Sequence, residues 1–273
     1  MPELVPQLER LMDAAWPAAE RDEAGGWVLR AASGVTQRAN SVWPREPGED
    51  PEALRRSLAE ARRWYRERRL PLIFQVFEGP GYAPLNALLD AEGFTRQSET
   101  LILTLGLSGN AADGGSEAAT ASEVEVLDHA SEEWLRLWWS VDGRGGVESL
   151  PVAKAILEGC PSLYALVRDE HGEPAAVGRL ALPADDGDSG AATAPAAGIY
   201  GMATRPDARR NGYAGRVLRT LLREAEARGR RECWLLVTAV NTAARELYAR
   251  AGFSLAGSYL YRQDRPRRAP TGC

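Results

Sequence analysis

The residues most suited to chemistry lie in one stretch, 199–218, where a strand-like run leads through a loop into an amphipathic helix. The loop carries Arg209, Arg210 and Gly212 directly before the helix. The first turn of a helix has unpaired backbone N–H groups and a partial positive charge, and a glycine lets the backbone approach a ligand closely. Because arginine keeps its charge at any accessible pH, the stretch predicts a site for an anion such as a pyrophosphate.

Two motifs identify the kind of anion site. The spacing Arg209-x-x-Gly212-x-Ala214 is neither a Walker loop, which needs Gly-Lys-Ser/Thr, nor the three-glycine dinucleotide fingerprint. A second motif follows the next strand-like run and consists of Asn241, Ala244, Tyr248, Gly252 and Phe253. In order and separation the two motifs resemble the acetyl-CoA signatures of the GNAT superfamily of N-acyltransferases. The resemblance covers about residues 123–262 well and the N-terminal half only weakly.

This resemblance implies an acetyl-CoA-dependent N-acetyltransferase that transfers acetyl directly to a primary amine, with one active site in the C-terminal half. It assigns the following residues to the acetyl-CoA: Met202, Ala203, Thr204, Arg209, Arg210, Asn211, Gly212, Tyr213, Ala214, Gly215 and Asn241. The backbone of 202–204 would bind the acetyl carbonyl and pantetheine arm, and the amides of 209–215 would hold the pyrophosphate. Strand N–H groups from 199–204 would meet the oxyanion of the tetrahedral intermediate. Tyr248 would lie near the sulfur as the general acid for the departing thiolate.

Each assignment has a purely structural alternative. Arg209 and Arg210 could be solvated loop residues, Asn241 could cap the helix beginning at Thr242, and Tyr248 could be a core aromatic. The general base is a further open point, because the strand 199–204 holds no carboxylate where many relatives have a glutamate. The candidates for the base are Glu148, Glu173, Tyr200 and a water relay.

Composition excludes other classes of protein. The chain has 273 residues, 44% of them hydrophobic, and a formal net charge of -5, which speaks against a nucleic-acid protein driven by positive potential. Two histidines and three scattered cysteines leave almost no material for a zinc site or a disulfide framework. No apolar run is long enough for a membrane span, and no signal peptide is visible. We therefore expect a cytoplasmic enzyme without a metal, a membrane or a nucleic-acid partner.

The pattern of elements predicts an α/β (α+β) fold with two GNAT-like domains, each a mixed, mostly antiparallel sheet flanked by helices. The segment 88–94 matches 247–253 at an offset of 159 residues, and the same order of elements precedes both. We expect strands at 27–31, 36–43, 72–76, 99–105, 123–127, 162–168, 175–182, 199–204, 233–238 and 253–262, and helices at 51–69, 84–92, 134–139, 213–228 and 242–250. The expected domains are a degenerate one at 1–107 and a catalytic one at 123–265, joined by a linker at 108–122 and followed by a basic tail at 266–273. A low-complexity stretch, 183–198, reads as a long hairpin loop.

The N-terminal half has a poor counterpart of the anion site. Its loop, 43–50, contains prolines and three acidic residues, which would repel a pyrophosphate, so this half is not expected to bind acetyl-CoA. Arg38, Asn40 and Trp43 could face an acceptor cleft, although core packing is the default for alternating strand residues.

The leading hypothesis is thus an N-acetyltransferase acting on a small-molecule amine. The alternative is a non-catalytic acyl-CoA sensor or interaction module that kept the cofactor loop and lost turnover. The missing base favours the sensor, and the retention of Tyr248 favours the enzyme.

Overall fold

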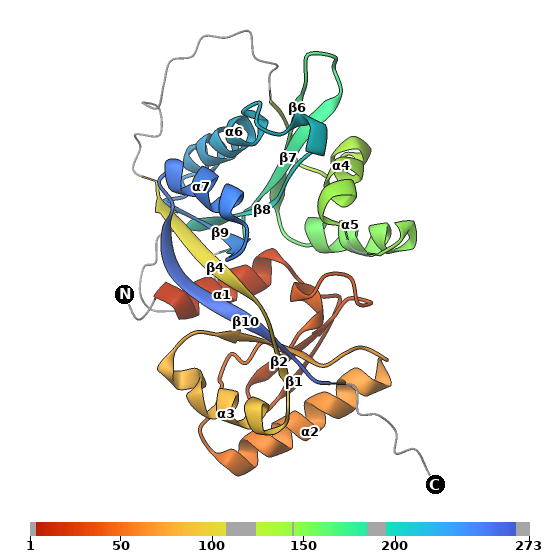
Figure 1. The fold of residues 1–273 in the computed structure, drawn as a ribbon, viewed down its shortest axis with the longest axis vertical. Coiled ribbons are helices and arrows are strands. Elements are labelled where there is room, and N and C mark those ends of the chain that lie inside the picture. The colour runs from red at the N-terminus through yellow and green to blue at the C-terminus, as the bar shows by residue number, and fades with distance from the viewer. Residues whose placement is uncertain (1–3, 108–123, 144, 185–194, 266–273) are drawn as a thin grey trace. The chain divides into compact units, whose positions relative to one another are not determined.

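The computed structural model of the chain describes residues 4–107, 124–143, 145–184 and 195–265 (Figure 1). Its contacts divide the chain into two discontinuous units. Unit 1 comprises Met1–Pro17 and Ile102–Ala256, and unit 2 comprises Ala18–Leu101 and Gly257–Cys273. The linker and the basic tail expected from the sequence lie outside the described residues, as does the middle of the expected hairpin loop.

This division differs from the domain boundaries expected from the sequence. The first helix, α1 (Leu4–Ala15), belongs to unit 1 with the second half of the chain. Two long strands, β4 (Thr95–Gly106) and β10 (Ser254–Gln263), each begin in one unit and end in the other. A boundary placed at a low-complexity stretch could not reveal this arrangement, because both crossings occur inside regular strands.

Unit 1 is built on a sheet with the strand order β4-β9-β8-β7-β6-β5. The members that lie wholly in this unit are β5 (Glu125–Leu127), β6 (Ser162–Arg168), β7 (Pro174–Ala181), β8 (Ala196–Thr204) and β9 (Glu232–Thr238). Pairing is antiparallel from β5 through β8, and β8 pairs with β9 in parallel. The expected mixed, mostly antiparallel sheet is confirmed.

Helices cover both faces of this sheet. Figure 1 shows α6 (Tyr213–Ala227) on one side of β6–β8 and α4 (Glu132–Asp142) with α5 (Leu150–Glu158) on the other. The predicted apolar face of α6 is buried, with Val217, Leu218 and Leu221 at its centre. Ser131 caps α4 by accepting from the Trp134 amide at 3.2 Å, as its position suggested. The last helix, α7 (Thr242–Arg250), follows β9.

A buried arginine connects the end of helix α1 to the sheet of unit 1 by hydrogen bonds. The Arg179 guanidinium on β7 donates to the Ala15 carbonyl at 3.0 Å and to the Ser162 hydroxyl at 3.0 Å. The Trp16 ring, just after the helix, lies 5.4 Å from the Tyr200 ring on β8. The N-terminal segment therefore completes the core beneath the strands that carry the anion-binding motif.

Unit 2 contains a hairpin of β1 (Glu20–Ala24) and β2 (Trp27–Ala31), the helices α2 (Pro51–Glu67) and α3 (Ala83–Ala91), and β3 (Ile73–Phe77). Strand β10 pairs antiparallel with β3. One buried cluster that includes Trp27, Leu58, Tyr65, Phe74 and Phe94 joins these elements.

The strand expected at 36–43 is wrong. A short 3-10 helix, Arg38–Asn40, takes its place, and only Val42 and Trp43 make isolated bridges, to Phe74 and Val28. The Asn40 side chain explains the change, since its oxygen accepts from two backbone amides and its amide nitrogen donates to three carbonyls nearby. Asn40 and Trp43 are buried, so neither is a surface residue of a cleft.

Candidate active site

Strand β8 parts from β9 at the place where the sequence locates the reacting group. Their parallel pairing ends at Ile199 opposite Leu235, although β8 continues to Thr204 and β9 to Thr238. On its other edge β8 stays paired with β7 as far as Thr204. The backbone of 200–204 thus presents the edge toward β9 without a ladder partner from that strand, which leaves N–H and C=O groups available to a ligand.

A β-bulge reshapes the same strand. Tyr200 lies opposite Arg179 and Ala203 opposite Val177, so Gly201 and Met202 together face the single residue Gly178. Gly201 has a φ of 59°, and an added Cβ would lie 3.0 Å from the Trp134 ring. A Cβ on Gly178 would lie 2.5 Å from the sulfur of Met202. The bulge therefore depends on two glycines, and sequence periodicity alone did not reveal it.

The loop that follows β8 ends in an open helix start. We call residues 209–215 the junction. Arg210 has a φ of 67° and Gly212, the N-cap of α6, has a φ of 77°, so two residues of the left-handed region bend the backbone within three positions. Gly212 offers no side-chain cap to the helix. The first amides of α6 are thus directed at the loop without an internal acceptor, which is the arrangement that binds anions.

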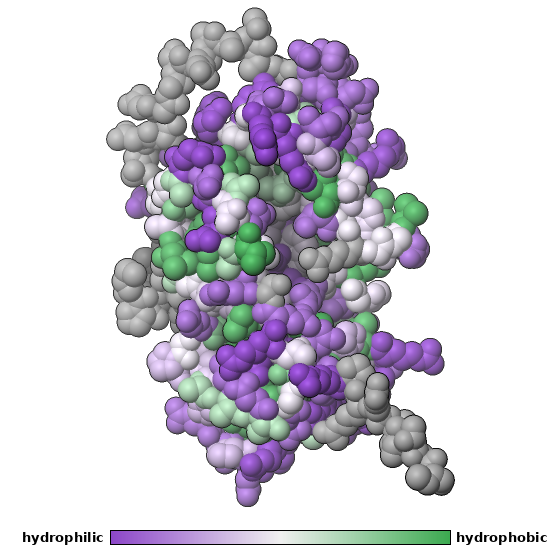
Figure 2. Space-filling view, in the orientation of Figure 1, coloured by the Kyte–Doolittle hydropathy of each residue, from purple (hydrophilic) through white to green (hydrophobic). Residues whose placement is uncertain are grey.

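The positive charge at the junction is not neutralised by nearby acids. Among the described residues, no carboxylate lies within salt-bridge distance of Arg209, Arg210, Arg216, Arg219 or Arg223. Several other arginines are paired, for example Arg62 with Asp264 and Arg168 with Glu133. Figure 2 shows a hydrophilic surface over the end of unit 1 where α6 and the β6–β7 hairpin lie. The sequence analysis named the first two of these arginines and missed the others.

Arg219 is the most informative of the missed residues. Its Nη1 lies 3.4 Å from the position that a Cβ on Gly215 would occupy, so the side chain reaches back along α6 to its first turn. The sequence signal for Arg219 is its i, i+4 spacing from Gly215, which places both residues on one face of the helix.

The second motif is placed at the start and along the length of α7. Asn241 caps this helix, because its side-chain oxygen accepts from the Ala244 amide at 3.1 Å. Tyr248 is buried, with its ring 6.0 Å from that of Phe253. Burial alone raises the pKa of Tyr248 to about 12, so its hydroxyl keeps its proton at physiological pH. Asn241 is thus a helix cap and Tyr248 is a buried aromatic, as the structural alternatives proposed. Neither role prevents the residue from contacting a ligand.

The three candidates for the base lie in different elements. The Tyr200 hydroxyl is inside unit 1 and accepts from the Trp234 indole at 3.0 Å. Glu148 is exposed in the short helix Val147–Ser149, and Glu173 is exposed in the turn before β7.

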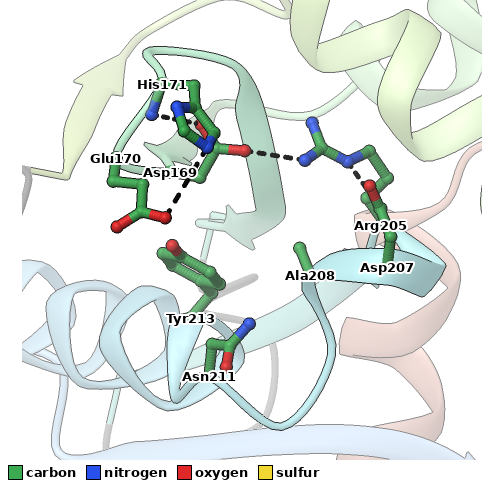
Figure 3. Close-up of a pocket in the computed structure, with 8 residues that line it drawn as sticks. All are labelled: Asp169, Glu170, His171, Arg205, Asp207, Ala208, Asn211 and Tyr213. Carbon is green, nitrogen blue, oxygen red and sulfur yellow. Dashed lines mark hydrogen bonds and ion pairs between the residues drawn. The ribbon is translucent and has the colours of Figure 1, made fainter.

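A polar cavity of about 210 Å³ adjoins the junction (Figure 3). The 169–171 turn of the β6–β7 hairpin forms one wall, and Arg205, Asn211 and Tyr213 line the other. Arg205 donates to Asp169 at 2.7 Å and to Asp207 at 2.7 Å. The Arg205 hydrogen bond holds the pKa of Asp169 below its usual range, so this carboxylate stays ionised.

Solved structures share this fold. A GCN5-related N-acetyltransferase from Kribbella flavida aligns with a TM-score of 0.68 at 18% identity, covering 96% of this chain and 95% of that one. A tandem GNAT protein from the clavulanic acid biosynthesis pathway aligns with a TM-score of 0.66 at 14% identity, covering 96% of this chain and 89% of that one. The fold, together with the relatives below, is that of an N-acetyltransferase of the GNAT superfamily.

Sequence relatives specify the family. The family model described as "Probable histone acetyltransferase Rv0428c C-terminal" matches residues 5–262, and the chain belongs to this family. YobR of Bacillus subtilis strain 168, an uncharacterised N-acetyltransferase, is 26% identical over 260 residues, which are 95% of this chain and 98% of YobR. The "Probable histone acetyltransferase Rv0428c" of Mycobacterium tuberculosis strain H37Rv is 32% identical over 131 residues, 48% of this chain and 37% of that protein.

Two further features bear on the expected partners. No helix among the described residues is long and apolar enough to cross a membrane. Within the same part of the chain, no group of three or more His, Cys, Asp or Glu side chains could hold a metal ion.

Proposed function

We propose that the chain transfers the acetyl group of acetyl-CoA to a primary amine at a single site in unit 1. The observation that carries the proposal is the continuity of three features along β8 and α6: the parted strand, the bulge at Gly201 and the uncapped junction. A thioester with a long arm and a pyrophosphate needs these features in this order. The site suits acetyl-CoA because backbone groups, helix amides and unpaired arginines match its amide, phosphate and charge.

In this proposal the protein supplies position and hydrogen bonds. Backbone N–H groups of 200–204 would hold the thioester carbonyl and stabilise the negative charge that grows on its oxygen as the amine adds. The amides of the junction, with Arg209 and Arg210, would fix the pyrophosphate. Tyr248 would hold a proton near the departing sulfur.

Unit 2 is proposed to lack such a site, and the start of α2 supports this. Asp50 caps α2 by accepting from the amides of Glu52 at 3.2 Å and Ala53 at 3.0 Å. A carboxylate of the protein thus occupies the position that a phosphate would need, whereas Gly212 leaves the start of α6 open. We therefore regard unit 2 as a degenerate GNAT-like domain.

For the acceptor we propose a small-molecule amine, with a protein amine as the second candidate. The name of the mycobacterial relative, a histone acetyltransferase, favours the second. The tandem GNAT protein described above belongs to a biosynthetic pathway for a small molecule, clavulanic acid, which favours the first. Release of free thiol from acetyl-CoA, measured over a panel of small amines and with a histone-tail peptide, decides between them. Acetyl-CoA binding without turnover on any amine would instead support the sensor.

Charge reversal tests the location of the site. Arg209→Glu with Arg210→Glu should weaken acetyl-CoA binding by roughly 100-fold or more, because charge-assisted hydrogen bonds contribute about 1.5–3 kcal/mol each and two arginines are changed. The control reverses the adjacent exposed pair Arg55 and Arg56 on α2, which changes the net charge equally. Calorimetry measures both. Equal affinity in the two double variants would contradict the assignment of the junction.

A further inference from the structure

Trp138 on α4 has a buried indole N–H without an acceptor. The residue is 2% exposed, and no oxygen among the residues that the structure describes accepts from its Nε1. A buried donor that stays unpaired costs free energy, so proteins seldom keep one without a reason. Trp64 on α2 also has an unpaired indole, so the N–H alone marks no site; the position of Trp138 does.

Trp138 lies against the bulge of β8. Its Cδ1, the ring atom bonded to Nε1, is 3.6 Å from the position that a Cβ on Gly201 would occupy, and the Trp134 ring is 3.0 Å from the same position. The Trp134 indole is held by the sheet, because its N–H donates to the carbonyls of Ala165 and Gly178, both at 3.1 Å. The centres of the two indole rings are 5.9 Å apart. Trp138 therefore keeps an unused donor, packed on a fixed neighbour, at the strand segment proposed to hold the thioester.

The two sides of the bulge differ in the space they leave. A Cβ on Gly178 would meet the side chains of Met202, Val217 and Leu221, so the side toward α6 is filled. Gly201, which has no side chain, faces α4 on the other side of the sheet (Figure 1). A thioester whose carbonyl is held by the edge of β8 lies close to the plane of the sheet, and an amine adds from above or below that plane. We therefore expect the amine to arrive from the side of α4, where the Trp138 N–H lies.

A hydrogen-bond donor at this place distinguishes between kinds of amine. An indole N–H can donate and cannot accept, so its partner must be an atom with a lone pair, such as a hydroxyl or carbonyl oxygen. A lysine side chain carries four methylenes next to its amine and offers no such oxygen. A site built to hydrogen-bond a polar group of the substrate rejects an analogue without it, because the protein group is then left buried and unpaired.

We propose that Trp138 is a specificity-determining residue whose indole N–H donates to an oxygen that the acceptor carries on the carbon next to its amine-bearing carbon. The substrate class is then a β-amino alcohol or an α-amino carbonyl compound, and a lysine side chain is excluded. The inference rests on the proposed function, since it names the acceptor of the same site.

Matched pairs of amines test this, in which methyl groups replace the polar group: ethanolamine with propylamine, and glycinamide with isobutylamine. The kcat/KM of the wild type, calculated for the free amine, should be about 10-fold or more higher for the member with the oxygen. Trp138→Phe removes the donor and should bring this ratio to within about 2-fold of one. Trp139→Phe changes the adjacent, half-buried indole and should keep the ratio of the wild type.

The ratio separates specificity from stability, because a general loosening of the fold lowers the rates with both members of a pair. The ratios of the wild type test the acceptor class even if Trp138→Phe does not fold. Equal kcat/KM values within each pair, turnover confined to amines without the oxygen, such as Nα-acetyl-lysine amide, or a preference that survives in Trp138→Phe would overturn the role of Trp138. Each of these results would leave acetyl transfer standing. Absence of turnover on every amine would instead overturn the proposed function, and this inference with it.

Discussion

The hydroxyl of Tyr248 is enclosed by protein, and burial raises its pKa to about 12. An ordinary thiol has a pKa of about 8.5, so full proton transfer from this tyrosine to a thiolate would be uphill by roughly 3 to 4 pKa units. A hydrogen bond from Tyr248 to the sulfur needs no such transfer. We therefore expect the side chain to stabilise the departing thiolate mainly by donating a hydrogen bond, with solvent completing protonation.

Tyr248→Phe tests this role. Loss of a hydrogen bond to a charged group should lower kcat by roughly 10- to 100-fold. The wild-type rate should show no effect of tyrosine ionisation below about pH 11, because the buried Tyr248 hydroxyl stays protonated up to that pH. Steady-state kinetics as a function of pH measures both, and an unchanged kcat in Tyr248→Phe would remove the residue from the mechanism.

The same pKa predicts a stability effect at alkaline pH. The folded value is raised above the unfolded value near 10, so the stabilising contribution is complete below pH 10 and is lost as pH rises toward 12. Urea unfolding between pH 9 and 12 should therefore show a steeper loss of stability in the wild type than in Tyr248→Phe. Parallel curves would mean that the hydroxyl is not buried in solution.

At the scale of elements, helix starts distinguish the two units. Asp50 caps α2, Asn241 caps α7, and Gly212 leaves α6 without a side-chain cap. A capping side chain stabilises a helix, whereas an open start keeps its amides for a ligand. The element that gives up local stability is the one in which the sequence motif predicts anion binding.

Removing the two capping side chains distinguishes a purely structural role from a role in binding acetyl-CoA. Asp50→Ala and Asn241→Ala should each lower the free energy of unfolding by about 1 kcal/mol, measured by urea denaturation. Only Asn241→Ala should also raise the KM for acetyl-CoA, because its helix begins beside the parted strand. A KM unaffected in both variants would restrict Asn241 to the capping role.

The sequence predicted the elements whose signals are local. Apolar positions such as Leu54 and Leu58 located α2, and Val217 and Leu221 located α6, since a helical period needs only neighbours in sequence. The strand expected at 36–43 is wrong because the side chain of Asn40 binds five backbone groups and bends the chain. The bulge at Gly201 was missed because it depends on the register with β7, which involves residues far away in the chain.

The candidate site likewise has one part that the sequence predicts and one part that it does not. The junction and α7 come from contiguous motifs, so the residues at 202–204, 209–215 and 241–248 could be named from the sequence. The cavity could not, because it needs the 169–171 turn to lie beside Arg205 and Tyr213, a pairing that only the fold creates.

At the scale of the whole molecule, the final strand of each repeat pairs with a strand from the other repeat, which the sequence repeat does not reveal. Equivalent positions in the two repeats lead into β4 and β10, yet β4 lies next to β9 and β10 lies next to β3. Both strands carry the same pattern, so the repeat showed that two related halves exist without showing which sheet each final strand enters.

This exchange makes a prediction for fragments of the chain. A cut within 108–122 produces a fragment, 123–273, that lacks Met1–Pro17 and the end of β4, both parts of unit 1. Produced alone, this fragment should not fold cooperatively, and after proteolysis of the intact protein the two pieces should elute together. Size-exclusion chromatography and thermal unfolding measure these outcomes. A separate fragment that unfolds cooperatively would show that unit 1 does not need those segments.

The crossing of β10 into unit 2 also has a consequence for synthesis. Unit 2 uses residues 18–101 and the strand segment that ends at Gln263, so its sheet can be completed only after residue 263 has left the ribosome. Until then the edge of β3 that pairs with β10 stays unpaired during translation. An unpaired strand edge is prone to aggregation, so chaperones would protect this state.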